Sequence, residues 1–250
     1  MLYPLKLQAA FKDYIWGGTR LRDEFNKQTT INPVAESWEL SCHHDGKSTI
    51  ENGPFAGKTL IEYIETEGKQ VIGTKAQDKT DFPILIKFID AKQNLSVQVH
   101  PDDTYALLNE GESGKTEMWY VMDAQPDSKL IYGFNKKISH QEFEKRITDN
   151  TLLEVCNQVP IKKGDVFFIE AGTLHAIGAG ALIAEIQQSS NSTYRVYDYG
   201  RLGKDGKPRQ LHIEKALAVT KLEPPTRKPE PVAKVNYFTD YDLTILAQCD

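Results

Sequence analysis

Short segments with the periodicity of β-strands dominate this sequence, and few segments have the periodicity of helices. Two are short, mainly apolar runs bounded by charged or turn-forming residues, which is typical of buried strands: 83–89 and 166–169. Others alternate between apolar and polar residues, as half-buried strands do: 95–100, 118–122, 182–187 and 194–199. Many short strands joined by Gly and Asp turns predict a mainly β fold, either a barrel or a sandwich.

Three segments have helical character. Residues 58–72 place apolar residues at helical spacing, residues 139–153 begin with a capping-box pattern, and residues 212–219 form a shorter candidate. Four prolines between Leu222 and Pro231 exclude a helix or a central strand, so this segment is expected to be a linker. We therefore expect one domain over residues 1–221, a linker over 222–231, and the start of a further unit over 232–250.

Composition and charge narrow the class of protein. The 250 residues are 40% hydrophobic and 26% charged, which is ordinary for a soluble globular chain, and 10% aromatic residues argue against a disordered one. The formal net charge of −5 offers no basic surface for general nucleic-acid binding. No nucleic-acid partner is therefore expected.

The expected location is the cytoplasm. The first residues lack the basic and apolar regions of a secretory signal, and no apolar run approaches the roughly 18 residues that span a bilayer, so no membrane partner is expected. The three cysteines, Cys42, Cys156 and Cys249, lie far apart and form no CxxC pair, which favours reduced thiols. The oligomeric state is left open by the sequence.

The segment 95–103 carries the first set of candidate site residues. Strand geometry puts Ser96, Gln98 and His100 on one face and the apolar residues Leu95, Val97 and Val99 on the other. Three polar groups backed by apolar ones describe the inner wall of a barrel that holds a polar ligand. A surface strand with a solvated polar face is the alternative.

Two further segments supply candidate metal ligands. Glu117 shares a strand face with Trp119 and Val121, and a carboxylate buried there needs a cation, whereas at a strand end it would be solvated. The run 166–169 leads through a glycine turn to His175, which alone is more often structural than a ligand. Together with His100, Glu117 and the Gln98 amide, however, it suits Zn²⁺ with an open coordination position. The remaining histidines, at positions 43, 44, 140 and 212, are interpreted as surface residues.

The segment 187–201 contains two arginines. Arg195 is expected to share a strand face with Tyr197 and Tyr199, and Arg201 follows six residues later. Guanidinium groups bind phosphate oxygens bidentately, so two arginines near a polar cavity fit an anionic ligand. Surface arginines paired with acidic residues are the alternative.

Taken together, these segments resemble the cupin superfamily and, within it, the short bacterial form of the type I mannose-6-phosphate isomerases. The resemblance rests on S-x-Q-V-H-P-D at 96–102, G-K-T-E-M-W-Y at 114–120, the second cupin motif from Gly164 to His175, F-K-D-Y-I-W-G-G at 11–18 and E-S-W-E at 36–39. The second cupin motif departs from the usual pattern at Glu170, where proline is common. The match covers residues 1–220.

The resemblance implies a role for each candidate. It implies one Zn²⁺ held by Gln98, His100, Glu117 and His175, an active-site arginine at Arg195, a lysine considered for proton transfer at Lys115, substrate contact by Ser96 and a phosphate-binding role for Arg201. It also implies a cupin barrel with a few peripheral helices. Relatives of the short form continue into a second small barrel, which is expected here to be truncated or absent.

The implied reaction interconverts mannose 6-phosphate and fructose 6-phosphate through a cis-enediol. Two other functions are considered. An Fe(II) cupin dioxygenase uses similar ligands but needs no cationic phosphate site, so Arg195 and Lys115 argue against it. A non-catalytic cupin that binds sugar phosphates is the second alternative, and an isomerase assay distinguishes it.

Overall fold

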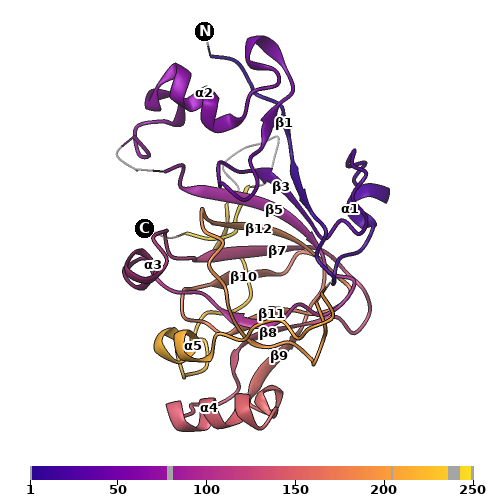
Figure 1. Ribbon diagram of the computed structural model, residues 1–250, viewed down its shortest axis with the longest axis vertical. Helices are drawn as coiled ribbons and strands as arrows, with labels where there is room; N and C mark the ends of the chain where they lie inside the picture. The colour runs from indigo at the N-terminus through magenta and orange to yellow at the C-terminus, as the bar shows by residue number, and fades with distance from the viewer. Residues whose placement is uncertain (1, 78–80, 204, 236–242, 249–250) are drawn as a thin grey trace.

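A computed structural model describes residues 2–77, 81–203, 205–235 and 243–248. The larger of two main sheets has antiparallel strands in the spatial order β10 (Val166–Ile169), β7 (Glu117–Ala124), β12 (Ala181–Gln188), β5 (Ile84–Asp90), β3 (Glu36–Leu40) and β2 (Ala10–Lys12). The smaller sheet has the order β13 (Tyr194–Tyr197), β6 (Val97–Val99), β11 (His175–Ile177), β8 (Lys129–Phe134) and β9 (Cys156–Pro160). The two sheets pack face to face (Figure 1), which confirms the mainly β barrel of the cupin type.

Helices are peripheral to this barrel, as expected (Figure 1). They are α1 (Arg20–Asp23), α2 (Leu60–Glu67), α3 (Asp103–Asn109), α4 (His140–Thr148) and α5 (Ile213–Val219), with short 3₁₀ turns at Gly53–Phe55, Lys69–Ile72 and Leu152–Glu154. Helix α4 begins where the sequence predicts, because the Ser139 hydroxyl accepts a hydrogen bond from the Glu142 N–H. In the described residues no helix combines the length and apolar character needed to cross a membrane.

Strand β6 separates two hydrophobic cores. Val97 and Val99 are buried in an outer core, which also contains residues of α4 and α5. Gln98, between them, faces the barrel interior and lines its cavity. The prediction that Leu95 lies with the valines is wrong, because it precedes β6 and packs in the inner core with Trp16.

A β-bulge alters the predicted surroundings of Arg195. This residue pairs with Gln98 of β6, but the next pair along β13 skips a residue and joins Tyr197 to Val97. Tyr197 therefore packs against the outer core, and Tyr199 lies beyond the strand with a φ of 57°. The prediction that both tyrosines share a face with Arg195 is wrong, because a bulge breaks the two-residue alternation.

The proline-rich segment forms neither helix nor strand, but it packs on the barrel. The Ile138 N–H donates to the Leu222 carbonyl, Leu222 packs against the outer core, and Arg227 stacks over the ring of Phe168. After this segment, β14 (Ala233–Val235) pairs with β15 (Leu243–Ile245). A second two-stranded sheet, nearer the N-terminus, pairs β1 (Leu7–Gln8) with β4 (Thr49–Ile50). Parts of the expected unit over 232–250, namely 236–242 and 249–250, lie outside the described residues.

Candidate active site and metal centre

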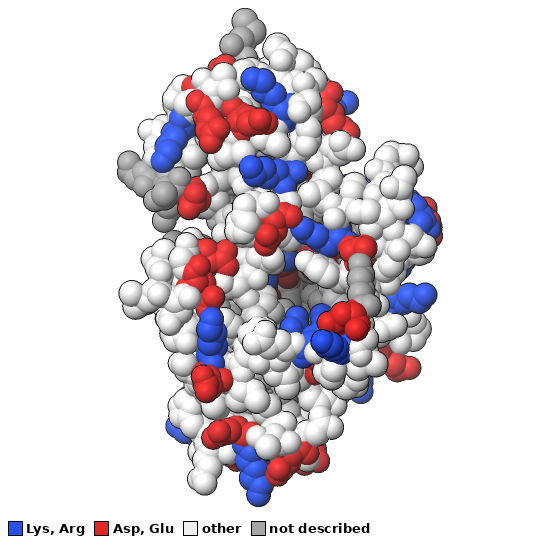
Figure 2. All heavy atoms as spheres, in the orientation of Figure 1, with Lys and Arg blue, Asp and Glu red and all other residues white. Residues whose placement is uncertain are grey.

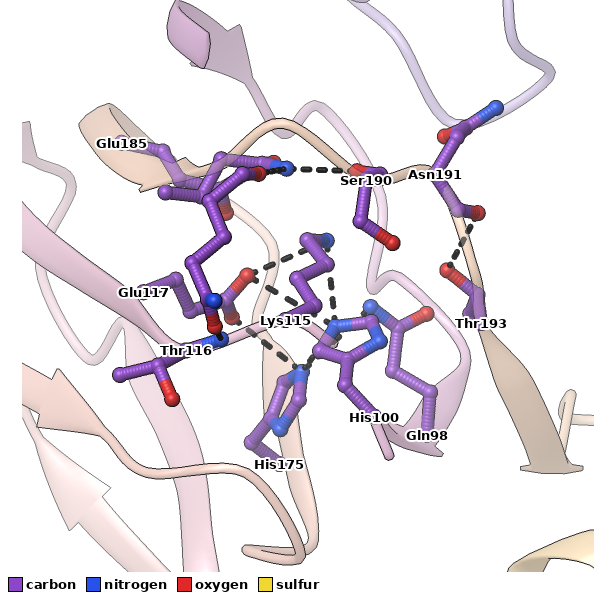
Figure 3. A network of polar contacts seen from close by, with 12 residues as sticks. Gln98, His100, Lys115, Thr116, Glu117, His175, Glu185, Ser190, Asn191 and Thr193 are labelled. Carbon is purple, nitrogen blue, oxygen red and sulfur yellow. Dashed lines mark hydrogen bonds and ion pairs between the residues drawn. The ribbon is translucent and has the colours of Figure 1, made fainter. Parts of the chain in front are cut away.

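Both main sheets contribute to one cluster of candidate ligands. His175 opens β11 and pairs across the strands with Gln98 of β6, while His100 directly follows β6. Glu117 opens β7 on the opposite sheet. Their side chains point toward one another inside the barrel (Figure 3), because each occupies an inward position of its strand or strand end.

The distances within this cluster are short. The Nε2 atoms of His100 and His175 are 3.1 Å apart. His100 Nε2 lies 3.6 Å from Oε2 of Glu117, and His175 Nε2 lies 3.4 Å from Oε1 of the same carboxylate. The ligand atoms of these three residues all fall within 4.8 Å of one another, and each residue is about 1% exposed.

Backbone carbonyls determine how the two imidazole rings are protonated. Nδ1 of His100 lies 2.7 Å from the Ser192 carbonyl, and Nδ1 of His175 lies 2.8 Å from the Thr173 carbonyl. A carbonyl only accepts, so each Nδ1 carries the proton and each neutral ring presents an Nε2 lone pair to the cluster. Burial favours this neutral form, because it lowers the pKa of His100 well below its ordinary value and that of His175 to about 4.

Glu117 adds further acceptors to the same cluster. Its carboxylate oxygens are buried and make no hydrogen bond of good geometry within the described residues. Burial, followed by the negative charge of Glu185, raises the pKa of Glu117. The Lys115 ammonium supplies positive charge beside it, 3.1 Å from Glu117 Oε2 and 3.1 Å from His100 Nε2 (Figure 3).

This donor set fits a divalent metal ion. Two imidazole lone pairs face each other at a distance where neither can donate to the other, and a buried carboxylate points at both. A cation between them resolves these contacts, and two imidazoles with a carboxylate are ligands that Zn²⁺ accepts. The Gln98 side-chain amide lies 3.5 Å from His175 Nε2, so it borders the same centre.

A cavity of about 300 Å³ lies beside the cluster, within the range of small-molecule sites. Sequence-predicted residues contribute to its wall, namely Ser96, Gln98, Lys115 and Arg195. The face drawn in Figure 2 is hollowed near its centre, and Lys and Arg side chains gather at the lower rim of the hollow. A larger cavity of about 930 Å³, next to α2, shares the lining residue Asn191 with it.

Arg195 is held in this cavity without a carboxylate partner. In the described structure its side chain donates to the Ser96 hydroxyl at 3.2 Å and to the Gln210 carbonyl at 3.0 Å, both neutral groups. Burial and then the positive charge of Arg209 lower the pKa of Arg195. A half-buried guanidinium with only neutral partners favours the entry of an anion.

The second arginine at the cavity is Arg209, which the sequence analysis did not select. Arg209 lines the cavity and makes two contacts with Asp198, at 2.7 and 2.5 Å. Arg201 is not among the lining residues, because its guanidinium is bound to Asp198 and to the Asn94 carbonyl. Two guanidinium groups thus share one carboxylate, which leaves this end of the cavity with excess positive charge.

A buried ion cluster in the cavity wall was also missed. Lys87 lies 3.0 Å from Glu185 and 3.6 Å from Glu36, and both carboxylates also accept from indole N–H groups, those of Trp119 and Trp38. Lys87 shares one face of β5 with buried Leu85 and Ile89. A charge on an apolar strand face, the signal that selected Glu117, would have found it.

His43 departs from the interpretation as a surface residue. Its side chain is only 5% exposed, because the loop between β3 and β4 folds over it and its ring packs against the edge of Trp38. His43 Nε2 lies 3.3 Å from Glu112, on the loop between α3 and β7. Contacts between loops distant in the sequence leave no periodic signal, so the sequence could not reveal this burial.

Comparisons with known proteins agree with this architecture. A family model described as "Phosphomannose isomerase type I, catalytic domain" matches residues 4–115. The chain is 45% identical over 220 residues to the Bacillus subtilis protein "Probable mannose-6-phosphate isomerase GmuF", covering 88% of this chain and 69% of that protein. It is 42% identical over 225 residues to the Streptococcus mutans mannose-6-phosphate isomerase, covering 90% and 70% respectively.

A solved structure extends the similarity to nearly the whole arrangement. The crystal structure of the mannose 6-phosphate isomerase from Bacillus subtilis superposes with a TM-score of 0.91 at 38% identity. The superposition covers 100% of this chain and 78% of that one. The similarity therefore includes both main sheets.

Proposed function

Because this chain belongs to the type I mannose-6-phosphate isomerase family, we propose that it interconverts mannose 6-phosphate and fructose 6-phosphate in the cavity lined by Gln98, Lys115 and Arg195. One observation carries the proposal: the same small cavity is lined by Gln98 and Lys115, which contact the metal-type ligand cluster, and by Arg195, which makes no ion pair with the described carboxylates. A sugar phosphate needs both, since it has oxygens to polarise and a phosphate to neutralise. Neither group on its own would require such a substrate.

The proposed metal ligands are His100, Glu117 and His175, with Gln98 as a fourth. When bound, Zn²⁺ would polarise sugar oxygens and stabilise the negative charge that develops on them. The unfilled acceptors of the three buried residues support a divalent ion here. The barrel strands hold these side chains in place before the ion arrives.

Arg195 is proposed to bind the phosphate, with Ser96 and Arg209 beside it. A phosphate monoester carries about −1.5 to −2 charges at pH 7, so its binding in a negatively charged protein needs a local excess of cations. Arg209, which lines the cavity, shares the single carboxylate of Asp198 with Arg201, whereas Arg195 contacts neutral groups. Arg201, the residue implied by the resemblance, is proposed to act indirectly, by holding Asp198 and the chain around it.

Lys115 is proposed to move the proton between the two carbons. A cation bound at the cluster would favour the free amine of Lys115 over the ammonium. The amine would take the proton from C2 of the open-chain aldose, leaving the cis-enediol in its ionised, enediolate form, and would return that proton to C1 while the hydroxyl proton passes from O2 to O1. Lys115 lines the cavity and its Nζ lies 3.1 Å from Glu117 Oε2, so a substrate bound there beside the ligand cluster would be within reach of the amine. A suitably placed general base contributes about 10²–10⁴-fold to the rate.

The test is an assay that couples fructose 6-phosphate formation to a detectable product, with purified protein and added Zn²⁺. We expect turnover that chelation abolishes and Zn²⁺ restores, and a loss of at least about a hundred-fold in kcat for Lys115→Met. Binding of mannose 6-phosphate measured by calorimetry, without any turnover, would overturn the proposal and favour the non-catalytic sugar-phosphate-binding cupin. Metal-dependent oxygen uptake would instead indicate a dioxygenase.

A further inference from the structure

The loop between β12 and β13 determines how His100 is oriented. The Ser192 carbonyl accepts the Nδ1–H of His100 at 2.7 Å, which turns Nε2 toward the ligand cluster. Groups that accept the second N–H of a ligating histidine fix its ring and tune its affinity for the metal. The position of this carbonyl therefore matters for His100, and Ser192 itself is on a loop with no strand pairing of its own.

Glu112 holds that loop from the far side. Its Oε1 accepts the Ser192 hydroxyl, and its Oε2 lies 3.5 Å from the Asn191 N–H. Two consecutive residues of the loop therefore donate to one carboxylate. Glu112 belongs to the loop between α3 and β7, so the contact joins segments that are 80 residues apart.

His43 supports Glu112 from a third loop. The Asp45 N–H donates to His43 Nδ1 at 3.1 Å, so the opposite nitrogen carries the proton and donates to Glu112 Oε2 at 3.3 Å. Although burial acts to raise it, these hydrogen bonds from His43, Ser192 and Asn191 lower the pKa of Glu112 to about 2. Glu112 is thus a charged, half-buried acceptor of hydrogen bonds from His43, Asn191 and Ser192.

We infer that Glu112 is a positioning residue for His100: through Ser192 it fixes the carbonyl that orients the imidazole for metal binding. The inference rests on the proposed metal site. None of the residues Glu112, Ser192 and His43 lines the cavity beside the ligand cluster. Their proposed role is to support His100 from outside that cavity. The contacts form a chain in which His43 contacts Glu112, Glu112 contacts Ser192, and Ser192 contacts His100.

The test compares the Zn²⁺ affinity of the wild type with that of Glu112→Gln, by competition with a chromogenic chelator. The amide keeps the size of the side chain but turns an N–H₂ group toward one of the donors, which loosens the loop. We expect the dissociation constant for Zn²⁺ to rise about 10-fold, at the lower end of the effect of outer ligands. Glu110→Gln is the matched control, because Glu110 lies on the same loop but contacts Lys215 and Tyr194.

A second readout follows His100 directly. In protein labelled with ¹⁵N-histidine, the Nδ1–H of His100 should give a slowly exchanging proton resonance in the zinc-bound wild type. That resonance should broaden or exchange faster in Glu112→Gln and remain in Glu110→Gln. A general loss of stability would lower the melting temperature without this selective change.

Ser192→Ala removes the hydroxyl but keeps the carbonyl, so it should weaken Zn²⁺ binding in the same direction as Glu112→Gln. The double variant should be no weaker than the weaker single variant, because both changes break the same contact. Wild-type affinity and an unchanged His100 resonance in Glu112→Gln would overturn the inference. All these readouts are independent of turnover, so a failure of the proposed isomerase activity would be seen separately.

Discussion

Two buried polar clusters lie side by side in this barrel, and they are balanced differently. In one, Lys87 lies between Glu36 and Glu185, and two indole N–H groups complete the carboxylates. Although burial alone would lower it, the charges of both carboxylates raise the pKa of Lys87 above its ordinary value. Each carboxylate of this cluster therefore has an indole donor and a cation within the protein, although Glu185 Oε1 contacts Lys87 as an ion pair only.

The His100–Glu117–His175 cluster is not balanced in this way. Its members are acceptors that face one another, and Lys115 at its edge is the cation that contacts it in the described structure. Burial of similar depth therefore has opposite meanings: the first cluster is part of the folded core, whereas the second is arranged for a ligand. The balance of hydrogen-bond donors and acceptors within a buried cluster, more than its burial, therefore identifies the candidate site.

The largest expected effect follows from removing a ligand. His175→Ala should abolish stoichiometric Zn²⁺ binding and lower kcat/KM by more than about a hundred-fold, since outer groups alone account for 10–100-fold. Elemental analysis and the coupled assay measure these two losses. The far-ultraviolet circular dichroism should be unchanged, and exposed His140→Ala serves as the control. A variant that keeps its zinc would place the metal elsewhere.

A substitution in the Lys87–Glu36–Glu185 cluster should lower the stability of the fold. Lys87→Met leaves two buried carboxylates without their cation, so the free energy of unfolding should fall by about 3–5 kcal/mol. Urea titration of the metal-free protein measures this, and exposed Lys92→Met should change it by less than about 0.5 kcal/mol. If Lys87→Met is as stable as the wild type, the distinction between the two clusters fails.

The same contrast applies to the arginines. Arg195 has neutral partners, so Arg195→Ala should lower kcat/KM by about 10- to 100-fold with zinc content unchanged, as expected for a charge-assisted hydrogen bond. Arg201 already has Asp198, so Arg201→Ala should have a smaller effect. Steady-state kinetics with mannose 6-phosphate test the order. A greater loss for Arg201→Ala would return the phosphate site to that residue.

The smallest effect is expected outside both clusters. In the described part of the chain, β14 and β15 pair only with each other, so we expect the segment 232–250 to contribute little to the stability of the barrel. Deleting them should lower the melting temperature by no more than about 2–4 °C, which corresponds to about 1 kcal/mol for a domain of this size. Calorimetry measures the shift. Failure of the shortened chain to fold would move the proposed domain boundary beyond residue 231.

The sequence predicted those parts of the fold in which strand alternation is regular. Glu117, Trp119 and Val121 share a buried face as expected, because β7 is continuous and one side of it faces the core. The alternation failed for Leu95, which precedes its strand, and for Tyr197, which follows a bulge. Period-two reasoning holds only while the backbone stays extended and paired.

The candidate site was predictable for a related reason. Gln98 and Glu117 lie on strands, and His100 and His175 at strand ends, so local patterns could point to them. Arg209 and Glu112 lie on loops, and their significance depends on partners such as Asp198 and Ser192 that are close only in the folded protein. No local pattern encodes these contacts.

One residue, His212, forms hydrogen bonds with both backbone polar groups of Arg195. Its N–H donates to His212 Nδ1, and its carbonyl accepts the His212 N–H. The segment 196–211 therefore forms a loop whose two ends meet beside the cavity, because the residues that flank it, Arg195 and His212, are hydrogen-bonded to each other. Changes within it that keep Asp198, Arg209 and Gln210 can alter its surface while the Arg195 guanidinium keeps its contacts, so this stretch is a natural place for evolution or engineering to vary selectivity without rebuilding the barrel.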